Sequence, residues 1–453
     1  MMARSGALAC LLLLSACGEE GRSLEVRFTT SALPRLDPFV SSGLRQVRVS
    51  VVGAETHDEI LIDVDLGARG VSLDGLVSDQ VAVQIEGLDA AQSVVAFGRA
   101  SVNLGQESQV DIPFRRNLAY VIHQPVAGQK QPARSIYALD LASRSLVDEI
   151  LLPGAIPEAR GITPRGGDSM IVTWRDGPQG QVGLLSLDDH SIGNVVVLPG
   201  IQDTCVGAEG SSRAVAVGLG RISFVDFRAG SAVALDQGVG GTVIDAVISG
   251  DGRRALVSLQ MPSALLLVDL ERQEVEAQTV LPDPGGLALD AAGQVAFVTS
   301  RTARQVAAFE LGNRRTNLIT GFLAAPVDLA VFSEPLRAVV GVNRDRPVGR
   351  ILAFSTSSGS STPLEGAIET LEAPMSIAAD GTGRRFVVVA GSSTVSAGLT
   401  IIDTGPSSLQ GSGRLYPGDP DDTFTVSSGS PDREPVLGRQ RYQPRAVAVA
   451  YGR

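Results

Sequence analysis

One pattern recurs along most of the chain: an apolar run that ends in a polar, mostly acidic residue, as in LLLVDLE at 265–271. The residues that end these runs are Asp140, Asp188, Asp226, Asp269, Glu310, Ser355 and Asp403. Successive ends lie 48, 38, 43, 41, 45 and 48 residues apart, which is the spacing of repeats that each form one four-stranded blade. An acidic residue at the end of a strand accepts hydrogen bonds from the turn that follows, so a structural role is expected for these residues.

A second marker opens each repeat: a proline, two residues, an aliphatic residue and an alanine. It is found as PGGLA at 284, PVDLA at 326, PMSIA at 374 and PRAVA at 444. Only a few residues follow the last copy, whereas LAYVIH at 118–123 has the pattern of a second strand with no opening strand before it. We therefore predict that a strand at about 445–451 pairs beside residues 118–152 and completes the first repeat.

This pairing predicts a seven-bladed β-propeller over residues 117–453, with one composite blade and six that open near residues 159, 203, 244, 284, 326 and 374. Closing the ring removes the two exposed strand edges that an open array would leave.

Residues 24–116 have a different organisation. Short runs of alternating apolar and polar residues, such as Val47 to Val51, are separated by turn-forming clusters. Six or seven short strands of this kind predict a small β-sandwich of immunoglobulin-like or transthyretin-like type. The whole chain is therefore expected to be all-β.

The first residues have the features of an export signal. Arg4 precedes an apolar stretch from Ala7 to Leu14, which is too short to span a bilayer. The stretch leads into Leu-Ser-Ala-Cys at 14–17, which resembles the lipobox of bacterial lipoproteins. The resemblance implies removal of residues 1–16, lipid attachment at Cys17 and a tether at 17–23. The other interpretation is an ordinary secretory signal cleaved near Ala16.

The residue after the cysteine is Gly18 and not aspartate, which in such lipoproteins implies transport to the outer membrane. The protein would then face the periplasm or the cell surface. Several acyl chains on one residue predict stable attachment. The other cysteines are Cys10, which leaves with the signal, and Cys205, so the mature chain has no intramolecular disulfide. A formal charge of −11 argues against nucleic acid as a partner.

The segments AFVTS, LLLVDLE and LTIIDT resemble those of the YVTN-type and lactonase-type seven-bladed propellers of bacteria. Propellers have many activities, so the resemblance implies the fold more than a function. Lactonase-type propellers hold a divalent cation in the central channel, and Asp245 and Asp328 are the acidic residues nearest to the expected inner strands. Asp419, Asp421 and Asp422, in the long segment 418–441, are further candidates for calcium.

Catalytic motifs are missing from the sequence. There is no G-x-S-x-G elbow and no Walker-type loop, and none of the histidines forms a close-spaced metal pair. His190 follows two aspartates in an expected turn, where we predict a solvated side chain. No catalytic residue is assigned, and no cofactor is expected apart from a possible divalent metal.

Basic residues gather in the loops expected between the second and third strands of each blade. The candidate binding residues are Arg175, Arg221, Arg301, Arg304, Arg344 and Arg346. A positive loop face within an acidic protein would attract a small anionic ligand or an acidic protein surface. In the alternative interpretation, Glu158, Asp203, Asp283 and Glu372 in neighbouring loops neutralise it.

Two functions from different classes follow. The first is an outer-membrane lipoprotein whose propeller acts as a protein- or ligand-binding platform. The second is a lactonase-like hydrolase with a channel-bound divalent metal.

Overall fold

The computed structural model describes residues 21–449 with several gaps. The residues outside it within this range are 55–56, 65–68, 126–133, 144, 219, 236–240, 291, 332–336, 344–348, 356–367, 371–373, 383–384, 391–397, 405–408 and 415–441. Apart from one short helix, α1 (Pro38–Ser41), the regular elements of the described residues are strands. No helix in this part of the chain is long and apolar enough to cross a membrane.

The first eight strands form two sheets, which we call the two-sheet unit (residues 22–116). One sheet has the order β4-β1-β7 and the other the order β3-β2-β5-β6-β8. The strands are β1 (Arg22–Thr29), β2 (Gln46–Gly53), β3 (His57–Asp63), β4 (Gly70–Leu76), β5 (Gln80–Leu88), β6 (Val94–Asn103), β7 (Gln109–Pro113) and β8 (Arg115–Arg116).

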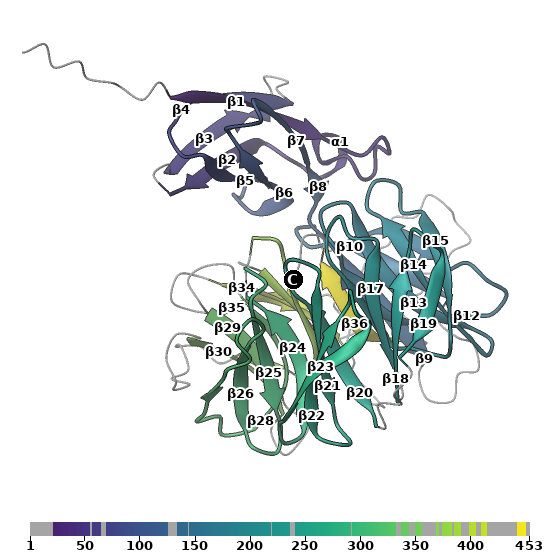
Figure 1. Cartoon of the computed structure of the whole chain (residues 1–453). Helices are drawn as coiled ribbons and strands as arrows, with labels where there is room; N and C mark the ends of the chain where they lie inside the picture. The colour runs from purple at the N-terminus through teal and green to yellow at the C-terminus, as the bar shows by residue number, and fades with distance from the viewer. Residues whose placement is uncertain are drawn as a thin grey trace, which may run out of the picture.

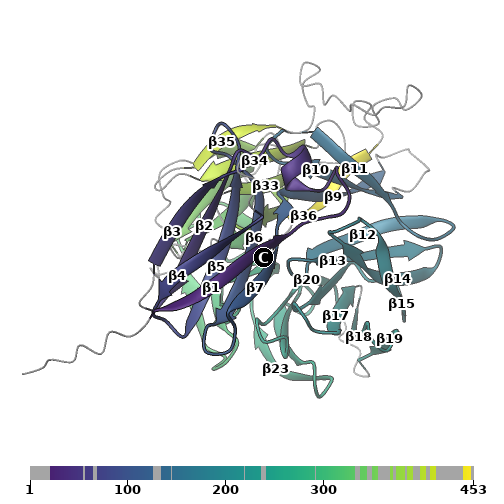
Figure 2. The same ribbon diagram turned by 90° about the horizontal axis from the view of Figure 1, so that it is seen from above.

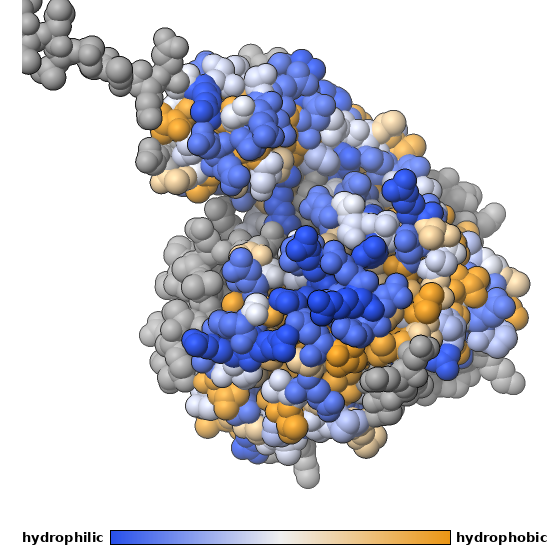
Figure 3. All heavy atoms as spheres, viewed as in Figure 1, coloured by the Kyte–Doolittle hydropathy of each residue, from blue (hydrophilic) through white to orange (hydrophobic). Residues whose placement is uncertain are grey.

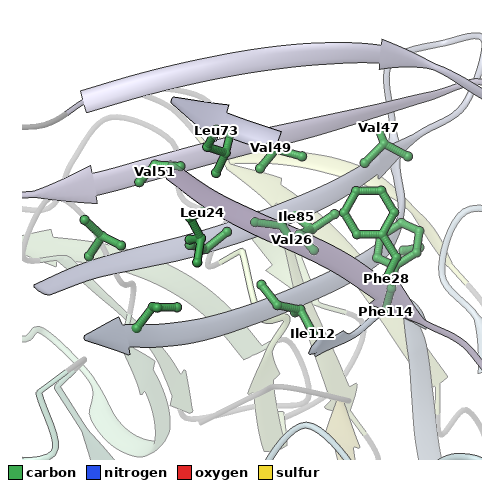
Figure 4. Close-up of a cluster of buried hydrophobic side chains, with 14 of the residues drawn as sticks. Leu24, Val26, Phe28, Val47, Val49, Val51, Leu73, Ile85, Ile112 and Phe114 are labelled. Carbon is green, nitrogen blue, oxygen red and sulfur yellow. The ribbon is translucent and has the colours of Figure 1, made fainter. Parts of the chain in front are cut away.

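The core of the two-sheet unit is built from strands that alternate between buried and exposed residues. Leu24, Val26 and Phe28 of β1 are buried, and the residues between them are exposed. They meet Val47, Val49 and other buried residues of the second sheet in one hydrophobic cluster (Figure 4). Because the side chains of a strand alternate between its two faces, the buried residues of each sheet lie on one face, and the two sheets pack together through these faces.

The remaining strands form seven four-stranded sheets in the described residues, which we call the seven-sheet unit (residues 118–449). The sheet that contains both ends of this unit has the order β11-β10-β9-β36, with β9 (Leu118–Pro125), β10 (Ser135–Asp140), β11 (Ser145–Leu151) and β36 (Tyr442–Val449). In the other six sheets, four consecutive strands pair antiparallel in chain order.

The first three of these six sheets are β12 (Pro157–Pro164), β13 (Ser169–Asp176), β14 (Gln179–Ser186) and β15 (Ile192–Leu198); β16 (Thr204–Gly207), β17 (Arg213–Gly218), β18 (Arg221–Asp226) and β19 (Ser231–Ala234); and β20 (Val243–Ile248), β21 (Arg254–Leu259), β22 (Ala264–Asp269) and β23 (Glu274–Val280). The next three are β24 (Pro284–Leu289), β25 (Val295–Ser300), β26 (Gln305–Glu310) and β27 (Thr316–Ile319); β28 (Ala325–Val331), β29 (Arg337–Asn343), β30 (Gly349–Ser355) and β31 (Ile368–Thr370); and β32 (Pro374–Ala379), β33 (Arg385–Ala390), β34 (Gly398–Thr404) and β35 (Leu409–Arg414).

The last strand pairs with the first strand of the seven-sheet unit, as the sequence predicted. β36 lies antiparallel to β9, with Val447 opposite Val121 and Val449 opposite Ala119. Val121 and Val449 are fully buried. The pairing thus gives the first sheet its fourth strand and covers an edge of β9 that would otherwise be open.

The innermost strands of the seven sheets contact one another in order. β12 contacts β16, and the contacts continue through β20, β24, β28 and β32 to β36, which in turn contacts β12. The sheets lie around a common centre in Figure 1 and, seen from above, in Figure 2. The chain is therefore all-β, and its larger part has a propeller-like arrangement of small antiparallel sheets.

The two ends of the strands in this unit have different surroundings. Loops between first and second strands, and between third and fourth strands, emerge at one end, which we call the junction end. The two-sheet unit docks there: Arg116 donates to Asp140 at 2.5 Å, and Asn117 donates to Asp380 at 3.1 Å. Loops between second and third strands, and the connections between sheets, emerge at the opposite end, which we call the loop end.

The expectation that His190 is solvated is wrong. Its side chain is buried, its Nε2 lies 3.0 Å from the Tyr120 hydroxyl, and its Nδ1 lies 2.8 Å from the Asp148 carboxylate. Arg35 of the two-sheet unit donates to the same carboxylate at 2.9 Å. The turn that carries His190 is thus enclosed by neighbours that are distant in the sequence.

The structural role of the acidic strand ends is confirmed at three of them. Asp140, Asp226 and Asp269 each accept two backbone N–H groups of the following turn. Asp188 differs, because its carboxylate pairs with Arg115 of the two-sheet unit at 2.5 Å.

Candidate functional site

The inner strands of the seven-sheet unit surround a cavity of about 440 Å³. Its walls come from β12, β16, β20, β24, β28, β32 and β36, and it extends to loops of the junction end. Arg99 of the two-sheet unit also lines it. The volume falls within the range of about 300–1,000 Å³ that is usual for small-molecule sites.

Two carboxyl groups line this cavity. Asp245 lies on β20 directly before Ala246, and Asp328 lies on β28 directly before Leu329. The Asp245 carboxylate accepts the N–H of Leu287 on β24 at 2.9 Å, and the Asp328 carboxylate accepts the N–H of Ile377 on β32 at 2.8 Å. Each aspartate therefore links its own sheet to the next one.

The surroundings of these carboxyl groups disfavour the charged form. Burial raises the pKa of Asp245 to about 6. Burial, and then the neighbouring charge of Asp245, raise the pKa of Asp328 to about 8. Among the described residues no basic side chain forms an ion pair with either group, so only the backbone N–H groups that each carboxylate accepts offset part of the loss of hydration.

The donor set fits a divalent cation poorly. No three histidine, cysteine, aspartate or glutamate side chains of the described chain come together in a way that could hold a metal ion. The oxygens of Asp245 and Asp328 already accept backbone N–H groups, and calcium takes six to eight oxygen ligands. Asp419, Asp421 and Asp422 lie outside the described residues.

The candidate arginines of the loop end have mixed partners. Arg175 donates to Glu158 at 2.8 Å, and Arg301 donates to Asp283 at 2.6 Å. For these two arginines, the acidic residues of neighbouring connections provide the neutralisation that the alternative interpretation expected. Arg344 and Arg346 lie outside the described residues, as does Glu372.

Arg221 and Arg304 are bonded differently. Arg221 donates to the carbonyl of Pro199, and Arg304 donates to the carbonyl of Leu323 at 3.2 Å. Both side chains are exposed, and neither has an acidic partner among the residues that the structure describes. The positive charge that remains at the loop end is therefore smaller than the sequence suggested.

Large apolar side chains are exposed at the same end. They are Leu323 (89% exposed), Val280 (79%), Leu151 (69%), Met261 (64%), Ile156 (55%) and Met375 (43%). The other exposed large apolar residues in the described part of the seven-sheet unit lie on its outermost strands β15, β19 and β27, and none lies in the junction-end loops. Figure 3 shows such hydrophobic areas between hydrophilic ones on one face of the molecule.

The sequence analysis did not identify this apolar set. Leu323 lies next to Arg304, a loop residue that it did consider, but the exposure of these apolar side chains depends on where the sheets end. The thiol of Cys205 is not accessible to solvent, because the residue is buried on β16, and burial raises the pKa of this thiol. Cys17 lies outside the described residues.

Comparisons with known proteins give a resemblance of fold only. No protein-family model and no curated protein matches the chain. Among solved structures, hydrazine synthase of Kuenenia stuttgartiensis is similar over 54% of this chain and 76% of its own, with 15% identity and a TM-score of 0.45. A chain of a mitotic checkpoint complex is similar over 57% of this chain and 81% of its own, with 12% identity and a TM-score of 0.49. Similarities of this size assign neither a family nor an activity.

Proposed function

We propose that the chain is an outer-membrane-anchored lipoprotein whose seven-sheet unit is a seven-bladed β-propeller of the YVTN type and acts as a protein-binding platform. The two-sheet unit is a β-sandwich that separates the platform from the lipid anchor at Cys17. The observation that carries the platform is the set of six exposed large apolar side chains at the loop end.

The propeller assignment is supported by the order of the sheets. Seven four-stranded sheets are present in the described residues, and their inner strands contact one another from β12 to β36 and back to β12. The motifs AFVTS, LLLVDLE and LTIIDT, which suggested the YVTN type, lie on β25, β22 and β34. The sandwich assignment is supported by the single core that the two N-terminal sheets share.

The composition of the loop end favours a protein partner. Exposed methionine and arginine, here Met261, Arg221 and Arg304, are enriched at protein interfaces. Leu323 and Arg304 lie together, because the arginine donates to the leucine's carbonyl. A small anionic ligand is less well supported, since Arg175 and Arg301 already have acidic partners.

The position of the two-sheet unit also favours this function. Thr29, at the end of β1, accepts a hydrogen bond from Arg115 at the junction. Arg22 begins the same eight-residue strand. At about 3.3 Å per residue, Arg22 lies roughly 23 Å from Thr29 along β1. A chain anchored at Cys17, five residues before Arg22, would therefore approach the unit from the side away from the junction and present the loop end to the surroundings.

The platform is tested by cross-linking the lipidated protein in its native membrane and identifying what is recovered. The test variant carries Leu323→Asp and Val280→Asp at the loop end. The matched control carries Leu318→Asp and Val233→Asp, which are exposed residues of outermost strands. We expect the test variant to lose a partner that the wild type and the control retain. Identical recovery from all three proteins would overturn the platform at this face.

The anchor is tested separately with Cys17→Ser. We expect the wild type to stay in the outer-membrane fraction after a high-salt wash and the variant to appear in the soluble fraction. A wild type that washes off would refute the lipid anchor without affecting the platform.

The metal-dependent hydrolase has less support, because the carboxylates of Asp245 and Asp328 already accept backbone N–H groups and fit a divalent cation poorly. Metal analysis of the purified protein checks it: one tightly held divalent ion per chain would restore the hydrolase as the better proposal.

A further inference from the structure

The cavity contains a pair of carboxyl groups that no described contact explains as a structural ion pair. Asp245 and Asp328 approach it from two sheets that are separated by one sheet, β24–β27. Asp245 accepts the N–H of Leu287, and a Cβ atom at Gly286 would lie only 2.0 Å from an oxygen of Asp328. Both carboxyl groups therefore converge on the Gly286–Leu287 segment of β24.

Gly286 makes this convergence possible. Any other residue would place a side chain where the Asp328 carboxylate lies. Two carboxyl groups that approach the same segment repel each other when both are charged, so a proton on one of them or a bound cation stabilises the arrangement. The pKa values of about 6 and about 8 leave the pair with close to one negative charge at neutral pH.

The charged groups around the cavity leave this negative charge uncompensated. The other charged residues that line it are Arg99, Arg165, Glu209 and Asp290. Arg165 belongs to the junction end and donates to Ser169 at 3.1 Å and to Ser211 at 2.5 Å. Asp290 accepts two backbone N–H groups of its own turn, and Glu209 accepts the N–H of Gly167 at 3.4 Å. Arg99 has an interaction of its own and does not contribute to the pKa shift of Asp245 or Asp328.

Besides the hydroxyl side chains of Thr163, Ser249 and Ser376, aliphatic side chains line the cavity. They are Ile162, Val206, Leu287, Leu329, Ile377 and Val447. From the level of Asp245 to the junction-end loop at Ser249 the strand extends four residues, or about 13 Å. The cavity thus combines a single negative charge at its inner level with an aliphatic wall along its length.

We infer that this cavity is a binding site for a small organic monocation, a primary amine with an aliphatic body, whose ammonium group lies between Asp245 and Asp328. An ammonium group donates three hydrogen bonds and needs only a few acceptors, which the free lone pairs of the two carboxyl groups provide. Its aliphatic body packs against Leu287, Leu329 and Ile377. A divalent metal is a poorer fit, because each carboxyl oxygen already accepts a backbone N–H group and no third histidine, cysteine, aspartate or glutamate of the described residues joins the pair.

The test is calorimetric titration of the full mature chain with n-butylammonium, with butan-1-ol as the neutral probe of the same shape and with calcium ions. We expect n-butylammonium to bind and butan-1-ol to bind at least tenfold more weakly. We expect Asp245→Asn and Asp328→Asn each to weaken n-butylammonium at least tenfold, and Gly286→Ala to do the same by displacing the Asp328 carboxylate. Calcium at millimolar concentration should not displace the amine.

Each asparagine variant keeps one oxygen that can accept one of the two backbone N–H groups, and the fluorescence of Trp174, the single tryptophan, checks that each variant is folded. The loop-end variant with Leu323→Asp should bind the amine as the wild type does, which separates this site from the platform. Equal affinity for the amine and the alcohol, unchanged affinity in folded asparagine variants, displacement by calcium, or no binding of n-butylammonium would each overturn the inference.

Discussion

The buried carboxyl pair makes a specific prediction about stability as a function of pH. The perturbation is Asp328→Asn, which removes one titrating group and keeps an oxygen that can accept the N–H of Ile377. The pKa of Asp328 is raised by burial and by Asp245 to about 8, from an ordinary value of 3.8. Between these two values the folded state holds a proton that the unfolded state has released. The free energy of unfolding of the wild type therefore falls as the pH rises through this window.

The magnitude follows from the width of the window. From pH 5 to the pKa of about 8, at about 1.36 kcal/mol per unit, the Asp328 contribution reaches roughly 4 kcal/mol as an upper limit. Part of the carboxyl group faces the cavity, where water reaches it and reduces the cost of the charge. We therefore expect the free energy of unfolding of the variant, relative to that of the wild type, to rise by about 1–2 kcal/mol between pH 5 and pH 9.

The assay is urea unfolding at pH 5 and pH 9, followed by the fluorescence of Trp174, which is fully buried on β13. The matched control is Asp226→Asn. The pKa of Asp226 is lowered, first by the hydrogen bond from the Ala229 N–H, so it titrates below this pH range. The difference in the free energy of unfolding between this control and the wild type should be the same at both pH values. If the corresponding difference for Asp328→Asn also stays constant from pH 5 to pH 9, the reasoning is refuted.

Three further predictions concern the junction and the closing strand. Arg116→Met leaves a buried carboxylate without its partner and should lower the free energy of unfolding by about 3 kcal/mol; a loss below 1 kcal/mol in urea unfolding would contradict this. Val449→Asp places a charge at a fully buried position of β36 and should prevent the seven-sheet unit from folding, as seen by circular dichroism, whereas Val280→Asp at an exposed position should fold normally. The pKa of Asp148 is lowered, first by the hydrogen bond with His190, so its contribution is present at neutral pH and lost as the pH falls through the lowered value. Asp148→Asn should thus be less stable than the wild type at pH 7, and the difference between the two melting temperatures should shrink as the pH falls below the ordinary value of 3.8; a difference that does not shrink on acidification would argue against this contribution.

Much of the fold could be predicted, because strand alternation and repeat length are local properties of the sequence. The opening marker at Pro444 had no strands after it, and this predicted the pairing of β36 with β9. β4 was not foreseen, since Asp74 and Gly75 interrupt the alternation of GVSLDGL and Gly75 has a positive φ of 80°.

The site was harder to predict, because it depends on how separate sheets are placed around a centre. Asp245 and Asp328 could be selected as acidic residues on inner strands. That they converge on Gly286 depends on packing between three sheets, which leaves no signal in the local sequence. His190 was misjudged for the same reason: a turn residue is normally solvated, and here its neighbours come from other parts of the chain.

The pairing of β36 with β9 has a consequence for how this protein acquires its structure. The first sheet of the seven-sheet unit lacks its innermost strand until β36 has been synthesised. The seven-sheet unit cannot therefore reach its native state stepwise from the N-terminus, and its folding depends on contacts between residues at opposite ends of the unit, which makes it slow. If the chain is exported as proposed above, β36 has to cross the membrane before this sheet can be completed.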